Sequence, residues 1–153
     1  MFLPKDVFST VIESTPLVSI DLVIKSKQGQ CLLGYRTNRP ACGFWFVPGG
    51  RILKGERVDT AFSRLVKAEL GVDMTMSQAK SLGVYDHFYD DYVFGEGIST
   101  HYVVLAYEIE VDIKVDALPT SQHSNYKWFD VETLLADESV HCHSKWYFNK
   151  ASY

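Results

Sequence analysis

Residues 50–72 read GRILKGERVDTAFSRLVKAELGV, a glycine-rich turn that leads into an amphipathic segment. Apolar side chains recur in this segment at the spacing of one helix face: Val58, Ala61, Phe62, Leu65 and Val66. The pattern predicts a helix over Val58–Leu70, and Gly71 is the residue type that most often ends a helix. The run Phe44–Val47 before the glycines is strand-like, so a strand, a glycine loop and a helix follow one another.

Glu69 falls near the middle of the apolar face of this predicted helix, so its carboxylate points to the interior. An unpaired carboxylate is costly to bury, and Glu69 therefore needs a cation, a hydrogen-bond network or a metal. The alternative is that the last turn of the helix frays and the carboxylate reaches solvent.

The sequence on either side divides into further short strands and helices. Leu17–Lys25 alternates between polar and apolar residues, and a polar turn joins it to Cys31–Tyr35, which predicts a β-hairpin. Further strands are expected at Ser81–Phe88, His101–Val111 and Tyr126–Phe129. Further helices are expected at Lys5–Ser14, Val131–Ala136 and Ser144–Lys150. These elements predict an α/β (α+β) fold, a mixed β-sheet flanked by helices, in a single domain over residues 1–153.

The composition is that of a folded protein that needs a local site to bind an anion. Of 153 residues, 46% are hydrophobic and 22% charged, which excludes intrinsic disorder. The net charge of −4 gives no general attraction to nucleic acid or to an anionic membrane, so neither is an expected partner. All five arginines surround the glycine loop: Arg36, Arg39, Arg51, Arg57 and Arg64. This cluster predicts a cradle for a diphosphate, with a solvated loop face as the alternative.

The cysteines and the apolar runs indicate the compartment. The three cysteines are widely spaced and include no CxxC pair, so neither a disulfide framework nor a zinc knot is expected. No stretch is long and apolar enough to span a membrane or to act as a signal peptide. We therefore expect a cytoplasmic protein.

The segment quoted first resembles the signature of the Nudix family, G-x5-E-x7-R followed by E-x-G and an aliphatic residue. Six positions carry the resemblance: Gly50, Glu56, Arg64, Glu69, Gly71 and Val72. Leu65 and Ala68 depart from it, because the family has glutamates there that gather divalent metal and help to activate a water that attacks phosphorus. Their absence argues against ordinary pyrophosphate cleavage.

Other stretches extend the resemblance over essentially the whole chain to one Nudix subgroup, the GDP-mannose mannosyl hydrolases. They are MFL at 1–3, STPLVS at 14–19, RTNRP at 36–40, WFVPGGR at 45–51, HFYDD at 87–91, THYVVL at 100–105 and QH at 122–123. The resemblance implies hydrolysis of GDP-mannose, or of GDP-glucose, by water attacking the anomeric carbon with inversion. The products are GDP and free sugar, and phosphorus is not attacked, which fits the missing glutamates. The resemblance also implies a homodimer.

The same resemblance implies a magnesium site, with Mn²⁺ as an alternative metal. Its ligands would be the backbone carbonyl of Gly49, the carboxylate of Glu69 and the side-chain oxygen of Gln122. Mg²⁺ prefers about six oxygen ligands and usually keeps water and phosphate oxygens among them, so one protein carboxylate can suffice. Without the resemblance, Gln122 would be interpreted as an exposed loop residue.

Three residues are the candidates for the chemistry. His123 is the candidate base for the water, because histidine titrates near neutral pH. Arg36 is expected to stabilise the charge of the departing GDP, with Arg51 and Arg64 in support. Asp21 interrupts an apolar strand, and the resemblance implies that it stabilises positive charge on the sugar. A salt bridge from Asp21 to a neighbouring arginine is the alternative.

The remaining candidates bind substrate. By resemblance, the N-terminal segment forms the nucleotide pocket through Phe2, Leu3 and Phe8, and aromatic rings commonly stack on bases. Phe8 could instead face the core as an ordinary helix residue. Polar side chains in or beside the long loop Tyr89–Thr100 could bond sugar hydroxyls: His87, Tyr89, Asp90 and Tyr102. Without the resemblance, these are surface-loop and core residues.

Two other functions compete with this interpretation. The first is an ordinary Nudix pyrophosphohydrolase that recruits Glu56 or a loop acid in place of the absent glutamates. The second is a non-catalytic module that binds a nucleotide sugar without cleaving it. The identity of the products separates the three.

Overall fold

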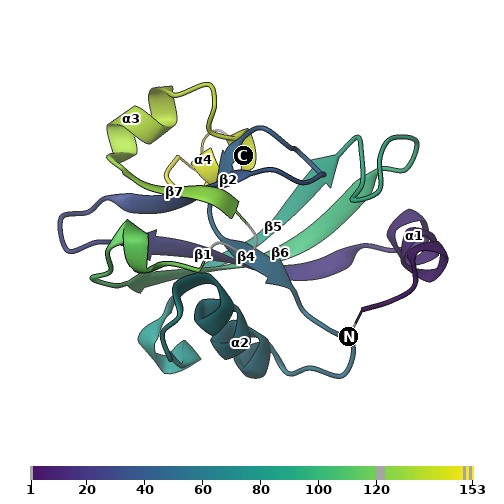
Figure 1. The fold of residues 1–153 in the computed structure, drawn as a ribbon, viewed down its shortest axis with the longest axis horizontal. Coiled ribbons are helices and arrows are strands. Elements are labelled where there is room, and N and C mark those ends of the chain that lie inside the picture. The colour runs from purple at the N-terminus through teal and green to yellow at the C-terminus, as the bar shows by residue number, and fades with distance from the viewer. Residues whose placement is uncertain (1, 120–122, 150, 152) are drawn as a thin grey trace.

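The computed structural model describes residues 2–119, 123–149, 151 and 153, with the backbone alone for residues 123 and 124. Seven strands among these residues form one sheet (Figure 1). They are β1 Leu17–Lys25, β2 Cys31–Arg36, β3 Trp45–Phe46, β4 Gly49–Arg51, β5 Lys80–Tyr89, β6 Thr100–Glu110 and β7 His123–Phe129. The order is β3-β2-β1-β6-β5, and β4 pairs with β1 while β7 pairs with β2. Since β1 and β6 are parallel and the other pairs antiparallel, the expected mixed sheet is confirmed.

Helices cover both faces of the sheet. They are α1 Lys5–Ser14, α2 Val58–Leu70, α3 Val131–Ala136 and α4 Cys142–Lys145, with 3₁₀ turns η1 Met76–Gln78 and η2 Val115–Ala117. The predicted ranges of α1, α2 and α3 are confirmed. The predicted range Ser144–Lys150 is wrong, because α4 begins at Cys142, where the ring of His141 accepts a hydrogen bond from the backbone N–H of His143, and ends at Lys145. Lys150 lies outside the described residues. Among the described residues, no helix is long and apolar enough to cross a membrane.

The predicted hairpin is correct only at its turn. β1 and β2 pair at Lys25 and Cys31 and then separate, so that β1 runs between β6 and β4 while β2 runs between β3 and β7. β4 was expected to be part of a glycine loop. A side chain at Gly49 would place its Cβ 2.3 Å from the carbonyl oxygen of Ile20, so only glycine lets this segment lie against β1.

The core on one face lies between β1 and α2. Ile20, Leu22 and Ile24 of β1 are fully buried and belong to one apolar cluster with residues of α2: Ala61, Phe62, Leu65, Val66 and Leu70. The helix ends at Gly71, whose φ of 72° lies in the left-handed region that glycine adopts without strain. Figure 1 shows α2 below the sheet, with α3 and α4 above it. The odd residues of β1 face this upper layer, where Val23 packs with Phe129 and Leu134.

Candidate active site

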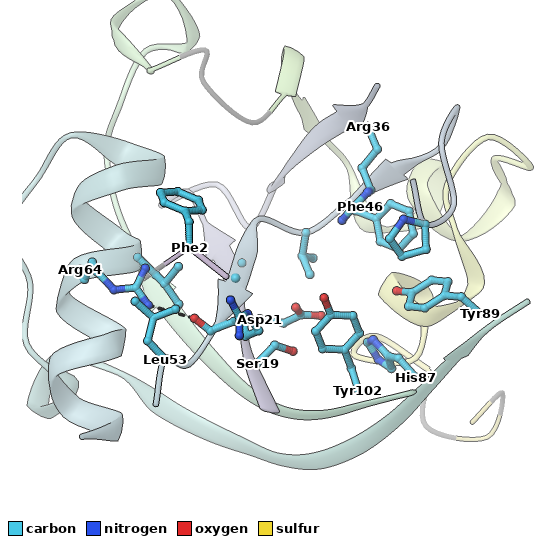
Figure 2. A pocket seen from close by; sticks show the side chains of 16 residues that line it. Phe2, Ser19, Asp21, Arg36, Phe46, Leu53, Arg64, His87, Tyr89 and Tyr102 are labelled. Atoms are coloured by element: carbon cyan, nitrogen blue, oxygen red, sulfur yellow. Dashed lines mark hydrogen bonds between the residues drawn. The ribbon is translucent and has the colours of Figure 1, made fainter. Parts of the chain in front are cut away.

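A cleft of about 710 Å³ opens where β1, β2, β4, β5, β6 and α2 meet (Figure 2). Nine residues proposed from the sequence line it: Phe2, Asp21, Arg36, Gly49, Arg51, Arg64, His87, Tyr89 and Tyr102. Figure 2 shows Asp21 and Tyr102 in the middle of the cleft, with Arg64 toward one end and Arg36, His87 and Tyr89 toward the other. The fold therefore brings most of the proposed catalytic and binding residues into one place.

Strand register explains this convergence. Asp21 of β1 pairs with Gly49 of β4, and Tyr102 of β6 pairs with His87 of β5. The backbone of His123 at the start of β7 pairs with Arg36 at the end of β2. Residues that are far apart in the sequence are thus fixed as neighbours by the backbone hydrogen bonds of a single sheet.

The other proposed residues lie outside the cleft lining or outside the described residues. Leu3 and Phe8 are half-buried on the N-terminal segment, Glu69 is buried on α2 outside the cleft lining, and Asp90 is exposed beyond the end of β5. Gln122 lies outside the described residues, and the backbone alone is described for His123. Their proposed roles remain predictions.

Phe8 is half-buried and belongs to none of the buried core clusters, although it lies one helical turn before Ile12, the buried residue of α1. The guanidinium of Arg51 lies 4.6 Å from the centre of the Phe8 ring, and the ring of Phe94 meets Phe8 edge-on at 6.2 Å. The ring of Phe8 therefore covers a guanidinium that lines the cleft.

Arg64 is bound by Glu56 through two hydrogen bonds, of 2.6 and 2.9 Å. It also donates to the carbonyl oxygen of Arg51 at 2.9 Å, and Glu56 accepts from the backbone N–H of Leu53. The hydrogen bond from Arg64 lowers the pKa of the Glu56 carboxyl below its usual value. Glu56 is thus engaged in holding the glycine loop onto α2, which weighs against its recruitment as a replacement catalytic acid.

Arg36 and Arg51 form no salt bridge with any described residue. The Arg36 guanidinium lies 5.4 Å from the centre of the Phe46 ring, and its buried Nε has no hydrogen-bond partner among the described residues. Buried donors are normally satisfied, and a guanidinium binds phosphate oxygens well. These two arginines are the best candidates in the cleft for binding an anion.

Asp21 bonds to a tyrosine. Its Oδ2 accepts a hydrogen bond of 2.5 Å from the hydroxyl of Tyr147, and no salt bridge to Asp21 forms among the described residues. Burial raises the pKa of Asp21 to about 7, although the hydrogen bond from Tyr147 and the charge of Arg36 both lower it. The salt-bridge alternative for this carboxylate is therefore wrong.

His87 is only 3% exposed, and burial lowers its pKa to about 4. Its ring stacks on His143 at 4.3 Å, and the ring of His141 lies 4.4 Å from that of His143. Burial likewise lowers the pKa of His141 to about 4 and that of His143 to about 2. Neutral imidazoles therefore back this side of the cleft at neutral pH.

Glu69 is 1% exposed, so the buried alternative from the sequence is confirmed. The hydroxyl of Tyr126 donates to its Oε2 at 3.2 Å. At the two departures from the Nudix signature, Leu65 is buried, and a Cβ on Gly50 would lie 2.5 Å from it, while Ala68 is exposed. α2 thus supplies one buried carboxylate and no acidic cluster.

A hard divalent cation fits these donors only with ligands from elsewhere. The carboxylate of Glu69 and the carbonyl of Gly49 are oxygen donors of the type that Mg²⁺ prefers, and phosphate and water can complete its shell. Among the described residues, the one compact group of three potential metal ligands is His141, Cys142 and His143. These are nitrogen and sulfur donors, and His141 Nδ1 already accepts the N–H of His143, so this group fits a structural role.

Sequence reasoning missed Tyr147, His141 and His143 as neighbours of the cleft. Tyr147 reaches Asp21 across 126 positions of sequence, and no local spacing signals such a contact. The only available signal was the density of aromatic and imidazole residues near the C-terminus.

Comparisons with known proteins agree with this architecture. The NUDIX domain model matches residues 15–149. The low-salt glycan biosynthesis protein Agl8 of Haloferax volcanii is 43% identical over 129 residues, which are 84% of this chain and 80% of that protein.

Two solved structures share the fold at low sequence identity. The MutT protein from Methanosarcina mazei Go1 is 20% identical, with a TM-score of 0.71 over 90% of this chain and 94% of that one. The NUDIX domain of Shewanella oneidensis NrtR, complexed with ADP ribose, is 18% identical, with a TM-score of 0.64 over 99% and 100% of the two chains. Because the NUDIX domain model matches residues 15–149, and the relative and the mixed sheet agree with that match, the chain belongs to the Nudix family.

Proposed function

We propose that this protein hydrolyses a GDP-hexose, GDP-mannose or GDP-glucose, by attack of water on the anomeric carbon with inversion, in the cytoplasm and as a homodimer. The observation that carries the proposal is the state of the Nudix helix. Leu65 is buried where the family has a glutamate, Ala68 carries no acid, and Glu56 is engaged by Arg64. The groups that serve attack on phosphorus are thus absent or engaged, whereas the cleft retains a carboxylate and two arginines without salt bridges.

In this reaction the oxygen of water bonds to the anomeric carbon as the bond from that carbon to the β-phosphate oxygen breaks. Arg36 and Arg51 hold the diphosphate and stabilise the charge that GDP carries away. Asp21 stabilises the positive charge that develops on the sugar ring, and His123 takes the proton from the water.

Nudix family members generally use divalent metals such as Mg²⁺. Here Glu69, the Gly49 carbonyl and Gln122 would hold the metal, whose charge would favour departure of the diphosphate. Tyr126 would orient the Glu69 carboxylate through its hydrogen bond of 3.2 Å.

The substrate class has two independent supports. The NrtR domain, which shares this fold, was crystallised in complex with ADP ribose, a nucleoside diphosphate joined to a sugar. The name of Agl8 assigns that relative to glycan biosynthesis, a process that consumes nucleotide sugars.

The proposal is tested by incubating the protein with GDP-mannose and Mg²⁺ and following the reaction by proton and phosphorus NMR. GDP-mannose is the α-anomer, so inversion predicts that β-mannose forms first, together with GDP. First formation of α-mannose would exclude inversion. GMP with mannose 1-phosphate would identify a pyrophosphohydrolase, and binding without products would identify a non-catalytic module.

A further inference from the structure

We propose that Tyr147 is a positioning residue, which holds the Asp21 carboxylate in the orientation that the sugar requires. The inference rests on the proposed function, because it assigns Asp21 to the sugar. It extends that function to a C-terminal residue that lies far from the Nudix signature in sequence.

The hydroxyl of Tyr147 lies between two polar groups of the cleft. It is 2.5 Å from Asp21 Oδ2 and 3.3 Å from His87 Nε2. A phenol has one proton to donate, and the carboxylate is the closer and stronger acceptor. The O–H of Tyr147 is therefore assigned as donating to Asp21, and the Nε2–H of His87 as donating to the phenol oxygen. The three side chains form a directed chain that ends on the carboxylate.

Packing fixes both donors of this chain. The ring of Tyr147 meets that of Tyr85 edge-on, at 4.9 Å and 88°. The ring of His87 is stacked on His143 at 4.3 Å and 19°. Since both rings pack against a neighbouring ring, the hydroxyl of Tyr147 has a defined position, and a hydrogen bond from it also defines the position of the carboxylate.

The other side of Asp21 is closed by backbone. A Cβ on Gly49 would lie 2.8 Å from Asp21 Oδ1, so β4 lies directly against this oxygen. No other side chain among the described residues donates a hydrogen bond to Asp21. The carboxylate is thus confined between the glycine of β4 and the Tyr147 hydroxyl, and removal of that hydroxyl would leave it without its side-chain donor.

The test is the variant Tyr147→Phe, which removes one oxygen and keeps the ring. We expect kcat for GDP-mannose to fall about tenfold to a hundredfold, the loss typical of deleting one hydrogen bond to a charged group. KM and the affinity for GDP should stay within about twofold, because Tyr147 does not line the cleft that holds the nucleotide.

Tyr85→Phe is the matched control. Tyr85 belongs to the same aromatic cluster, but its hydroxyl faces the Leu82 carbonyl at 3.5 Å and does not bond to the cleft. This variant should retain the wild-type kcat. Equal losses in the two variants would mean a purely structural role for Tyr147 and would overturn the proposal, as would an unchanged kcat in Tyr147→Phe.

A double-mutant cycle tests whether Tyr147 acts through Asp21. In an Asp21→Asn background, Tyr147→Phe should change kcat less than twofold, whereas independent roles would give the full additional loss and refute the inference. If Tyr147→Phe fails to fold, the unaltered tyrosine provides the measurement. Its hydroxyl proton should give a downfield NMR resonance that disappears in Asp21→Ala, which removes the acceptor, and persistence of the resonance would contradict the hydrogen bond.

The activity of the wild-type protein distinguishes failure of the proposed function from failure of the role proposed for Tyr147. If wild type releases no GDP and sugar from GDP-mannose, the proposed function fails and this inference fails with it. If wild type is active and the cycle is additive, the inference alone fails.

Discussion

The three histidines behind the cleft should make the protein less stable in weak acid. Burial lowers the pKa of His87, His141 and His143 to about 4, 4 and 2, below the unfolded value of about 6.5. Between these values the unfolded chain binds more protons than the folded one, so the free energy of unfolding falls as the pH falls below about 6.5. From pH 7 to pH 5, one such histidine removes about 2 kcal/mol of stability.

Asp21 works in the opposite direction. Burial raises its pKa to about 7, so the folded state takes up a proton before the unfolded state as the pH falls. This group returns about 2 kcal/mol of stability between pH 7 and pH 5. The histidines act on one another through their charges, so their separate contributions do not simply add.

The variant His143→Phe isolates one histidine. Phenylalanine keeps a ring against His87 and Trp146, and no described side-chain hydrogen bond is lost, because the buried Nδ1 of His143 has no partner among the described residues. The free energy of unfolding should be measured by urea denaturation at pH 7 and pH 5. The loss between the two pH values should be about 2 kcal/mol smaller in His143→Phe than in wild type.

Trp146→Phe is the control, since it alters packing in the same cluster without removing a titrating group. It should lower stability equally at both pH values. If His143→Phe and wild type lose the same stability on acidification, the histidines are not held neutral, and our account of this wall of the cleft is wrong.

Three further substitutions test individual roles. Arg36→Ala should lower kcat more than it raises KM in steady-state assays, whereas the exposed Arg57, which pairs with Asp59 away from the cleft, should tolerate the same change. His123→Gln should reduce turnover by roughly 10²–10⁴ if this residue is the base, and near-normal activity at neutral pH would eliminate it. Tyr126→Phe should weaken binding of Mn²⁺, followed by electron paramagnetic resonance, by about tenfold, and unchanged binding would argue against a role in orienting the ligand.

Local sequence patterns were sufficient to predict the helices and strands that are determined by interactions between residues close together in the sequence. The apolar stripe of α2 and the glycine after it determine that helix, and the same periodicity placed Glu69 in the interior. The alternation of β1 likewise marks the face whose Ile20, Leu22 and Ile24 pack with α2, but it does not show that Val23 on the opposite face is buried as well. In each case the deciding interactions lie within a few turns of helix or along one strand.

Pairing between distant segments could not be read in the same way. β1 separates from β2 because β4 pairs with β1. In the sequence, glycines 49 and 50 suggest a turn, and only the structure shows that the backbone of Gly49 lies close to Ile20. The hydrogen bond from Tyr147 to Asp21 joins a residue near the C-terminus to strand β1. Resemblance brought Asp21 into the predicted site, but the donor that holds it depends on tertiary packing alone.

The central claim is that water attacks carbon, and the fate of the solvent oxygen tests it most directly. The protein should be incubated with GDP-mannose and a divalent metal in ¹⁸O-water, and the products analysed by mass spectrometry. We predict free mannose that carries ¹⁸O and GDP that carries none. Label in GMP, in mannose 1-phosphate or in the phosphates of GDP would show attack on phosphorus and would contradict the account.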